Sequence, residues 1–382
     1  MDFALTETQK IFQDSVRSFA ENELKEGALS RAHSVEYPWE IAKLMAAQGL
    51  LGITISEGDG GQGGTLMDAV LAIEQVALAC PRSGDLIQAG NFGAIRVLAE
   101  FGSGDQKRRY LSKLLEGDSL IAVAMTEPNA GSAVTELETC AVPEGDGFRV
   151  KGTKIFTTHS VHANVFLVYV RYAEGVEGIG SVLVERGTPG LTFGPPSTFM
   201  SGEQWAELHF DEVYVPAENV LFGPGGFKRQ IAGFNVERLG NSARSLALAR
   251  YAYLAAQDYA QSRKQFGRQL CEFQGIQWKF ATMKMELDAA QLLLYRAATN
   301  ADNGFPSAEE TAIAKAYCNK VGFNVASEAL QVMGATGYTQ ELLVEYCFRR
   351  TRGWMIAGGA VEIMLNRIAE HVFGRRFSQR SR

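Results

Sequence analysis

The chain has few of the residues that build metal centres and disulfide frameworks. It contains five cysteines and five histidines in 382 residues. The cysteines are scattered without any CxxC spacing, which favours buried thiols in a reducing compartment over disulfides or zinc ligands. No two histidines stand four residues apart, so we expect no metal site. The cysteines are Cys80, Cys140, Cys271, Cys318 and Cys347.

Long apolar runs and an excess of positive charge are also missing. No stretch of about 18 apolar residues occurs, so we expect no membrane-spanning helix. The net charge is −6, and lysine and arginine are interspersed with acidic residues, which argues against nucleic acid as a partner. The N-terminal segment is amphipathic and acidic, unlike a signal peptide with its basic start and apolar middle. We therefore expect a cytoplasmic globular protein.

The hydrophobic pattern divides the chain into three blocks. Residues 1–118 show apolar residues mostly at helical spacing, and residues 119–226 show short strands between Gly, Pro and Asp turns, as in a small antiparallel barrel or sandwich. Residues 227–382 are helical again. Helices and strands in separate blocks predict an α+β protein rather than alternating βα units. The long helices are expected at about 228–263, 274–302, 307–334 and 358–374.

A glycine-rich segment, EGDGGQGG at 57–64, interrupts the first block. A phosphate-binding loop would be followed by GK[ST] and preceded by a hydrophobic strand, and this segment has neither. We interpret it as a loop between helices.

Two short segments carry the chemical signal, AMTEPNAGS at 124–132 and KIFTT at 154–158. In the first, Gly131 and Ser132 follow a proline-containing turn and offer backbone N–H groups and a hydroxyl to phosphate or carbonyl oxygens. The second is a β-branched and aromatic strand suited to hold a flat apolar ring. Taken alone, the first segment is more often an ordinary turn and the second an ordinary core strand. Together, in this order, they resemble the flavin-binding segments of the acyl-CoA dehydrogenase family.

The resemblance extends over essentially the whole chain. Three further segments match family motifs in family order: FDEVYVPAENVLFG at 210–223, SRKQFGRQLCEFQGIQ at 262–277 and QVMGATGYTQE at 331–341. It implies an N-terminal helical domain (1–118), a middle β domain (119–226) and a C-terminal helical bundle (227–382). It also implies a homotetramer that binds FAD between the β domain and the bundle, with a neighbouring subunit completing each site.

The resemblance assigns residues to that FAD site. Met125, Thr126, Gly131 and Ser132 would surround the ring and pyrophosphate, and Phe156 and Thr158 would lie against the isoalloxazine. Phe156 stands where a tryptophan is common and keeps the aromatic surface. Glu362 takes a position that the family uses near FAD, whereas Arg263 is alternatively an exposed cation at a helix end. The residues that would reach a neighbour's FAD are Arg263, Phe266, Gln274, Gln331, Gly334 and Ala335.

Oxidation of an acyl thioester requires a base for the Cα proton and donors for the enolate oxygen. The family's usual glutamate aligns with Gly358, in WMIAGGAVE, so no carboxylate is available there. The N–H of Gly358 remains to hold the thioester carbonyl. Glu237, in FNVERLG at the start of the first long helix, matches the base of isovaleryl- and long-chain-type members. Its neighbour Arg238 and Ser132 match substrate-contacting positions.

Glu237 and Arg82 each have a second interpretation. Glu237 is alternatively a structural residue that pairs with an arginine or stabilises a helix N-terminus. Arg82, in PRSGDLIQAG at 81–90, resembles the arginine with which glutaryl-CoA dehydrogenases grip a distal carboxylate. A buried arginine needs a partner, and Asp85 departs from the family pattern. The alternatives for Arg82 are an anionic acyl chain, a structural Arg82–Asp85 pair or a solvent-facing side chain.

We therefore expect an enzyme that oxidises a short or functionalised acyl thioester. Glu237 would abstract the Cα proton while a hydride leaves Cβ for the flavin, and an electron-transfer flavoprotein would be the acceptor. Alternatives are a desulfinase acting on sulfinate-bearing acyl-CoA, or a dehydrogenase acting on an acyl group bound to a carrier protein. A flavin-binding structural subunit is disfavoured because Ser132, Glu237 and Arg238 are retained.

Overall fold

The computed structural model describes residues 4–301 and 304–377, which form two compact units. One unit, here called the bundle unit, comprises residues 4–32, 66–85, 237–301 and 304–377. The other, the sheet unit, comprises residues 33–65 and 86–236. Each unit therefore joins segments that are far apart in the sequence.

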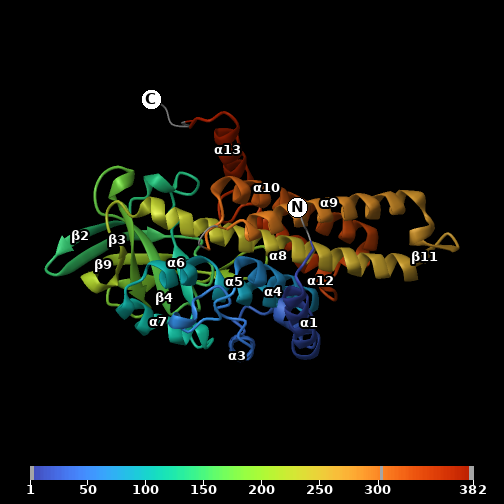
Figure 1. The fold of residues 1–382 in the computed structure, drawn as a ribbon, viewed down its shortest axis with the longest axis horizontal. Coiled ribbons are helices and arrows are strands. Elements are labelled where there is room, and N and C mark those ends of the chain that lie inside the picture. The colour runs from blue at the N-terminus through green and yellow to red at the C-terminus, as the bar shows by residue number, and fades with distance from the viewer. Residues whose placement is uncertain (1–3, 302–303, 378–382) are drawn as a thin grey trace. The chain divides into compact units, whose positions relative to one another are not determined.

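The bundle unit is built from long helices that lie side by side (Figure 1). Small residues allow this close packing: Ala252, Ala256 and Ala260 of α8 are fully buried at a spacing of four. α10 begins at the N-cap Ser307, whose hydroxyl accepts from the N–H of Glu310. The elements are α1 (Glu7–Phe19), α2 (Ala28–His33), α4 (Leu66–Ala79), the part of α8 (Phe227–Ser262) from Glu237 on, the β11–β12 hairpin (Lys264–Gln265, Arg268–Gln269), α9 (Gln274–Thr299), α10 (Ala308–Met333), α11 (Ala335–Tyr338), α12 (Leu343–Trp354) and α13 (Val361–Val372).

The sheet unit contains an eight-stranded sheet in the order β10-β5-β4-β2-β3-β9-β6, with β1 paired to β4. β1 and β2 both pair with β4 in parallel, so the sheet is mixed rather than purely antiparallel as expected. Long connections, not tight hairpins, lead into β4 and allow parallel pairing. The strands are β1 (Ile121–Ala124), β2 (Cys140–Glu144), β3 (Gly147–Lys154), β4 (Val165–Arg171), β5 (Ile179–Glu185), β6 (Leu191–Phe193), β9 (Leu208–Pro216) and β10 (Val220–Phe222), with a separate β7–β8 ribbon (Ser197–Thr198, Gln204–Trp205).

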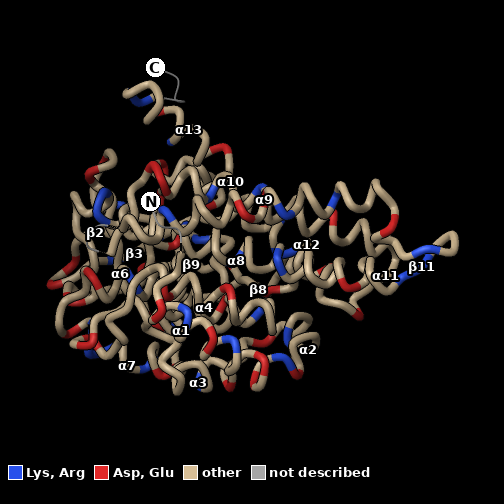
Figure 2. The backbone as a smooth tube through the Cα atoms, turned by 45° about the vertical axis from the view of Figure 1, so that its right-hand side comes forward, with Lys and Arg blue, Asp and Glu red and all other residues tan. Residues whose placement is uncertain are grey.

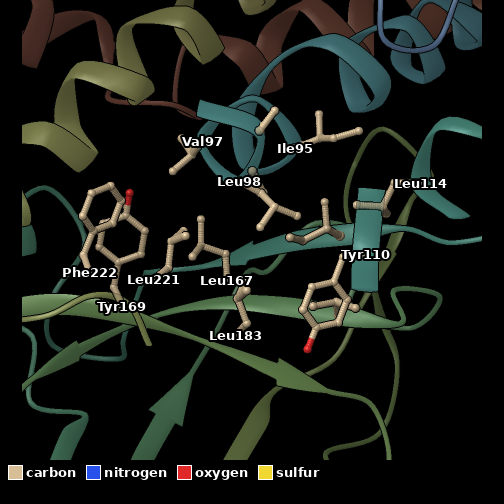
Figure 3. Close-up of a cluster of buried hydrophobic side chains, with 14 of the residues drawn as sticks. Ile95, Val97, Leu98, Tyr110, Leu114, Leu167, Tyr169, Leu183, Leu221 and Phe222 are labelled. Atoms are coloured by element: carbon tan, nitrogen blue, oxygen red, sulfur yellow. The ribbon is translucent and has the colours of Figure 1, made fainter. Parts of the chain in front are cut away.

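Helices cover one face of this sheet and bury its core (Figure 3). Leu98 of one helix and Leu114 of the next belong to the same cluster as Leu167 of β4 and Leu183 of β5. The glycine-rich segment 57–64 forms a 3₁₀ turn over Glu57–Asp59 and then a loop, as expected. The helices of this unit are α3 (Trp39–Ala47), the part of α5 (Gly84–Asn91) from Leu86 on, α6 (Gly93–Phe101) and α7 (Gly104–Leu115).

The α+β class and the order of helical, sheet and helical blocks are confirmed. The expectation that FNVERLG begins the first long helix is wrong, because α8 begins at Phe227, ten residues before Glu237. Glu237 therefore lies nearly three turns inside the helix, beyond the reach of an N-terminal dipole effect. Among the described residues, no helix is long and apolar enough to cross a membrane. Acidic and basic residues are interspersed along the described chain (Figure 2).

A buried carboxyl group links three helices of the bundle unit. Glu74 of α4 accepts a hydrogen bond of 2.7 Å from the Tyr295 hydroxyl of α9. Gln291 of α9 contacts the same carboxyl group and accepts from Arg250 of α8. Burial raises the pKa of Glu74 to about 7, against the opposing effect of these donors. The folded chain therefore holds a proton on Glu74 that the unfolded chain has already released near pH 6.

Glu74→Gln should reduce the pH dependence of stability. Since the folded pKa is raised, the contribution of Glu74 is complete below its ordinary pKa of 4.5, falls as the pH rises to about 7 and is then constant. This change amounts to at most about 3 kcal/mol of unfolding free energy. The glutamine variant should show a flatter profile of denaturation midpoints between pH 5 and pH 8. The exposed Glu21→Gln variant should keep the wild-type slope, and the same slope in both variants would contradict the assignment.

Candidate functional site

Two segments of the sheet unit, 125–132 and 154–158, are held together in the structure. The N–H of Ile155 donates to the carbonyl of Thr126 at 2.9 Å. This bond places Met125 and Thr126 alongside the strand end that carries Phe156. The two segments that the sequence analysis assigned to one binding site therefore lie next to each other in the structure.

A fully buried ion pair connects the same two segments. The Nζ of Lys154 lies 2.6 Å from Glu127 Oε1 and donates to the carbonyl of Met125 at 3.1 Å. Burial lowers the pKa of Lys154 to about 8, with Glu127 acting in the opposite direction. Burial also disfavours ionisation of Glu127, but Lys154 and the backbone donors outweigh it and hold the Glu127 pKa below its usual value. Both groups are therefore charged at neutral pH.

An open aromatic surface lies beside this ion pair. The Phe156 ring is 52% exposed and packs against Trp205, with ring centroids 4.6 Å apart. Phe156 has a φ of +54°, a strained conformation for a non-glycine residue that is typical of functional sites. Thr158, Gly131 and Ser132 are exposed, and an added Cβ at Gly131 would meet nothing within 4 Å. A flat ring with polar and phosphate groups fits this combination of apolar face, hydroxyls and free backbone.

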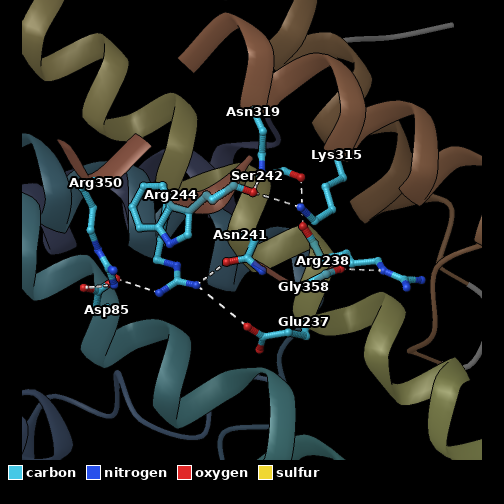
Figure 4. A network of polar contacts seen from close by, with 11 residues as sticks. Asp85, Glu237, Arg238, Asn241, Ser242, Arg244, Lys315, Asn319, Arg350 and Gly358 are labelled. Carbon is cyan, nitrogen blue, oxygen red and sulfur yellow. Dashed lines mark hydrogen bonds and ion pairs between the residues drawn. The ribbon is translucent and has the colours of Figure 1, made fainter. Parts of the chain in front are cut away.

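In the bundle unit, one face of α8 carries three polar residues at i, i+4 and i+7: Glu237, Asn241 and Arg244 (Figure 4). The Glu237 side chain is 22% exposed, and its Oε1 lies 3.8 Å from Arg244 Nη2. That distance is longer than a hydrogen bond. Arg244 Nη2 donates instead to Asn241 Oδ1. The neighbouring arginine is therefore only a distant partner of Glu237.

The charge of Arg244 is balanced by Asp85. Arg244 donates to Asp85 Oδ1 at 2.7 Å and Arg350 of α12 donates to Oδ2 at 2.8 Å. All three side chains are less than one-tenth exposed, and both guanidinium groups flank the ring of Trp354. Both oxygens of Asp85 thus serve arginines other than Arg82.

Arg82 is buried, so the solvent-facing alternative is wrong. Only 7% of the residue is exposed, and its Nη1 donates to the carbonyl of Arg31 in α2 at 2.6 Å. It lies in a 3₁₀ turn, Pro81–Ser83, directly before α5. The contact ties this turn to α2.

Gly358 lies in the turn between α12 and α13. Its carbonyl accepts from Arg238 Nε at 3.1 Å, and the carbonyl of Trp354 accepts from Lys315 at 3.1 Å and Asn319 at 2.6 Å. The φ of Gly358 is +70°, and a Cβ added there would lie 2.6 Å from Asn241 Nδ2. A side chain at this position requires Asn241 to move.

Lys315 is a fully buried cation beside this turn. Burial lowers its pKa to about 7; nearby Arg238 and Arg244 act in the same direction and Glu237 opposes them. The amine that supports Trp354 is therefore only partly protonated at neutral pH.

The remaining expected site residues lie at a different end of the bundle unit. From Glu237 to the end of α8 at Ser262 the chain runs 25 residues, roughly 38 Å at the usual helical rise. At that end of the bundle unit, α8 is connected to α11 through Tyr259 and Thr336, whose hydroxyl oxygens are 3.4 Å apart. Glu362 is exposed in the first turn of α13, close in sequence to Gly358. The exposed residues at the far end are Arg263, Phe266, Gln274, Gln331, Gly334 and Ala335.

Several polar residues were not anticipated from the sequence. They lie near the motif segments of the sheet unit and around Gly358 in the bundle unit. Glu127 and Lys154 belong to the two motifs, but their types gave no sign that they would pair. Arg244 and Lys315 interrupt otherwise apolar helical patterns, and this is the one signal that could have marked them. The others are Asn241, Asn319 and Arg350.

Three family models match the chain in sequence order. The N-terminal domain of acyl-CoA dehydrogenase matches residues 6–118, the middle domain 122–213 and the C-terminal domain 224–373.

Known proteins resemble the chain over its whole length. A short-chain-specific acyl-CoA dehydrogenase of Clostridium acetobutylicum is 33% identical, with 98% of this chain and 100% of that protein covered. A 3-sulfinopropanoyl-CoA desulfinase of Paraburkholderia xenovorans is 34% identical, with 99% of each covered. The structure of butyryl-CoA dehydrogenase from Megasphaera elsdenii superposes with a TM-score of 0.91 at 32% identity, covering 98% of this chain and 100% of that one. On these matches, and on its helical–sheet–helical architecture, the chain belongs to the acyl-CoA dehydrogenase family.

Proposed function

We propose that the protein catalyses the FAD-dependent α,β-dehydrogenation of an acyl thioester, with Glu237 as the base. The observation that carries this proposal is the position of Glu237. Its carboxylate is mostly buried on the face of α8 that meets Gly358, where the family's usual base is absent. Arg244 Nη2 lies 3.8 Å from Glu237 Oε1, which is longer than a hydrogen bond.

In this reaction, different residues of the chain would abstract the proton and bind the thioester oxygen. Bound FAD supplies the acceptor for a hydride from Cβ. Glu237 removes the Cα proton, and the Gly358 N–H holds the thioester oxygen as negative charge develops on it. Arg238 fixes the Gly358 carbonyl, while Lys315 and Asn319 fix the carbonyl of Trp354, four residues earlier in the same turn. Such anchoring keeps the donor in place before the substrate binds.

Members of the family bind FAD, and the sheet unit suits that cofactor. We assign Phe156 and Thr158 to the flavin ring, and Gly131 and Ser132 to its polar groups. Met125 and Thr126 would complete this half, and Glu362 would contribute from the bundle unit. The open aromatic surface and the bare backbone at Gly131 support the assignment.

A second copy of the chain would complete the site. Arg263 and Phe266 lie too far along the bundle from Glu237 to serve the same cofactor, and Phe266 is 94% exposed at a hairpin tip. This arrangement supports the proposal that they reach a neighbour's FAD in a homotetramer. An electron-transfer flavoprotein is the proposed acceptor, since that partner is associated with the family.

Desulfination is the second candidate. It is favoured by the missing carboxylate at position 358 and by the 34% identical desulfinase. Incubation with 3-sulfinopropanoyl-CoA distinguishes the two: release of sulfite would identify a desulfinase, whereas an enoyl thioester with reduction of the flavin would identify a dehydrogenase.

Glu237→Gln should fold and bind FAD but lose flavin reduction. Glutamine keeps the volume of the side chain and cannot accept the Cα proton. A positioned base contributes about 10²- to 10⁴-fold in rate, so anaerobic flavin bleaching by a panel of acyl-CoAs should slow by at least that factor. Glu286→Gln, the same substitution on α9, serves as control. Wild-type bleaching in Glu237→Gln would assign proton abstraction to another group.

Lys154→Met should abolish retention of FAD, because the buried Glu127 carboxylate would lose its partner. Breaking a buried pair in this way costs about 3–5 kcal/mol. Flavin absorbance per protein and the melting temperature measure the effect. Lys151→Met, on the same strand but exposed, should retain both values. Glu127→Gln/Lys154→Met should recover part of the stability, and full flavin content in the single variant would refute the role of the pair.

Arg82→Leu should lower the melting temperature and reduce kcat/KM equally for glutaryl-CoA and hexanoyl-CoA. The variant leaves the Arg31 carbonyl without its guanidinium donor, at a cost of about 1–3 kcal/mol. The exposed Arg108→Leu variant is the control. A loss confined to glutaryl-CoA would show instead that Arg82 binds a substrate anion.

A further inference from the structure

Three aromatic rings of the sheet unit, those of Phe156, Phe199 and Trp205, form one cluster. The centroids of the Phe156 and Trp205 rings are 4.6 Å apart, and those of Phe199 and Trp205 are 5.8 Å apart in a stacked arrangement. The Phe156 and Phe199 centroids are 6.4 Å apart. All three separations lie within the range at which aromatic rings attract one another. Phe156 belongs to the motif segment 154–158, whereas the other two rings belong to the β7–β8 ribbon and its turn.

This cluster lies at the surface of the sheet unit rather than in its core. Phe156 is 52% exposed, and Met200 in the turn of the ribbon is 57% exposed. Phe199 and Trp205 are partly exposed. By contrast, the ring of Phe166 in β4 is fully buried. An apolar patch that stays exposed in the folded chain marks a surface for interaction, and the most open ring of this patch is that of Phe156.

Hydrogen bonds fix the β7–β8 ribbon to the motif segment. The buried hydroxyl of Ser160 accepts from the N–H of Ala206 at 2.7 Å and donates to the carbonyl of Ala206 at 3.0 Å. Ser160 follows Phe156 by four residues, and Ala206 comes directly after Trp205. Because these two bonds join the backbone beside Trp205 to the end of the motif segment, the indole keeps one position against the Phe156 ring.

The indole packs against a residue whose backbone is strained. Phe156 has a φ of +54°, and three residues later His159 has a φ of +62°. Such conformations of non-glycine residues persist only where the surroundings determine them. Lys154 and Glu127 fix the chain on the N-terminal side of Phe156, and the indole contacts the Phe156 ring itself. Without the indole, the backbone could return to a negative φ, which would turn the Phe156 ring away from its present direction.

We propose that Trp205 is a positioning residue for the cofactor: its indole holds the Phe156 ring in the direction in which the open face of that ring receives the flavin. The inference rests on the proposed function through the assignment of Phe156 to the flavin ring. Since Trp205 acts through Phe156, removal of the indole should weaken FAD binding only while the Phe156 ring is present.

The test removes FAD from the purified protein and titrates it back. Flavin fluorescence gives the dissociation constant for FAD, and the melting temperature of the apoprotein measures folding separately. Trp205→Leu should raise the dissociation constant by about 2- to 10-fold, the range expected for one aromatic pair, and Trp205→Phe should restore most of the affinity. In the Phe156→Leu background, Trp205→Leu should have no further effect, because the ring that it positions is already absent.

Phe148→Leu is the control variant. It removes a ring from a different pair of the sheet unit, the one with Tyr172 at 5.0 Å, and should leave the dissociation constant unchanged. Unchanged FAD binding in Trp205→Leu would overturn the inference, even if the melting temperature fell, since the role of the indole would then be structural alone. So would an equal loss with and without the Phe156 ring. A wild-type apoprotein that binds no FAD would overturn the proposed function as well.

Discussion

The bundle unit depends on one buried carboxylate, that of Asp85, held between two arginines. The three residues come from segments far apart in the chain: Asp85 lies in the first turn of α5, Arg244 on α8 and Arg350 on α12. Removing one partner would leave an unpaired buried charge, an effect of several kcal/mol, so the segments keep one relative position. Because Arg244 also binds Asn241, this arrangement extends to the face of α8 that carries Glu237.

The sheet unit is also stabilised by a buried ion pair. Lys154 and Glu127 form a buried pair that joins the two motif segments, and Glu127 also accepts from the N–H of Thr139 at 2.9 Å. A strained Phe156 follows immediately, and strain of this kind persists only where the surroundings are firmly fixed. In both units, a buried ion pair thus supports a neighbouring group of the proposed site.

The long, strongly periodic helices were the most predictable elements. α8 was expected at about 228–263 and runs from Phe227 to Ser262, because its small apolar residues recur at three- and four-residue spacing. α12 was not anticipated. Its buried face includes Glu345, Arg350 and Thr351, and polar residues on the buried face conceal the apolar period from which a helix is recognised. The mixed pairing of the sheet was also unexpected, since strand patterns carry no information about direction.

By itself the sequence determined the family, the α+β class and the identity of the motifs, because these depend on local patterns and on residue types in order. The partners of its charged residues were decided by the tertiary structure. Asp85 stands three residues from Arg82 and yet binds Arg244 and Arg350, 159 and 265 residues away. Likewise, Asn241 fills the space that a side chain at position 358 would need, and this follows only from the packing of α8 beside the turn at Gly358. Pairings of this kind follow from how distant segments pack, since a buried charge selects the partner that packing brings within reach.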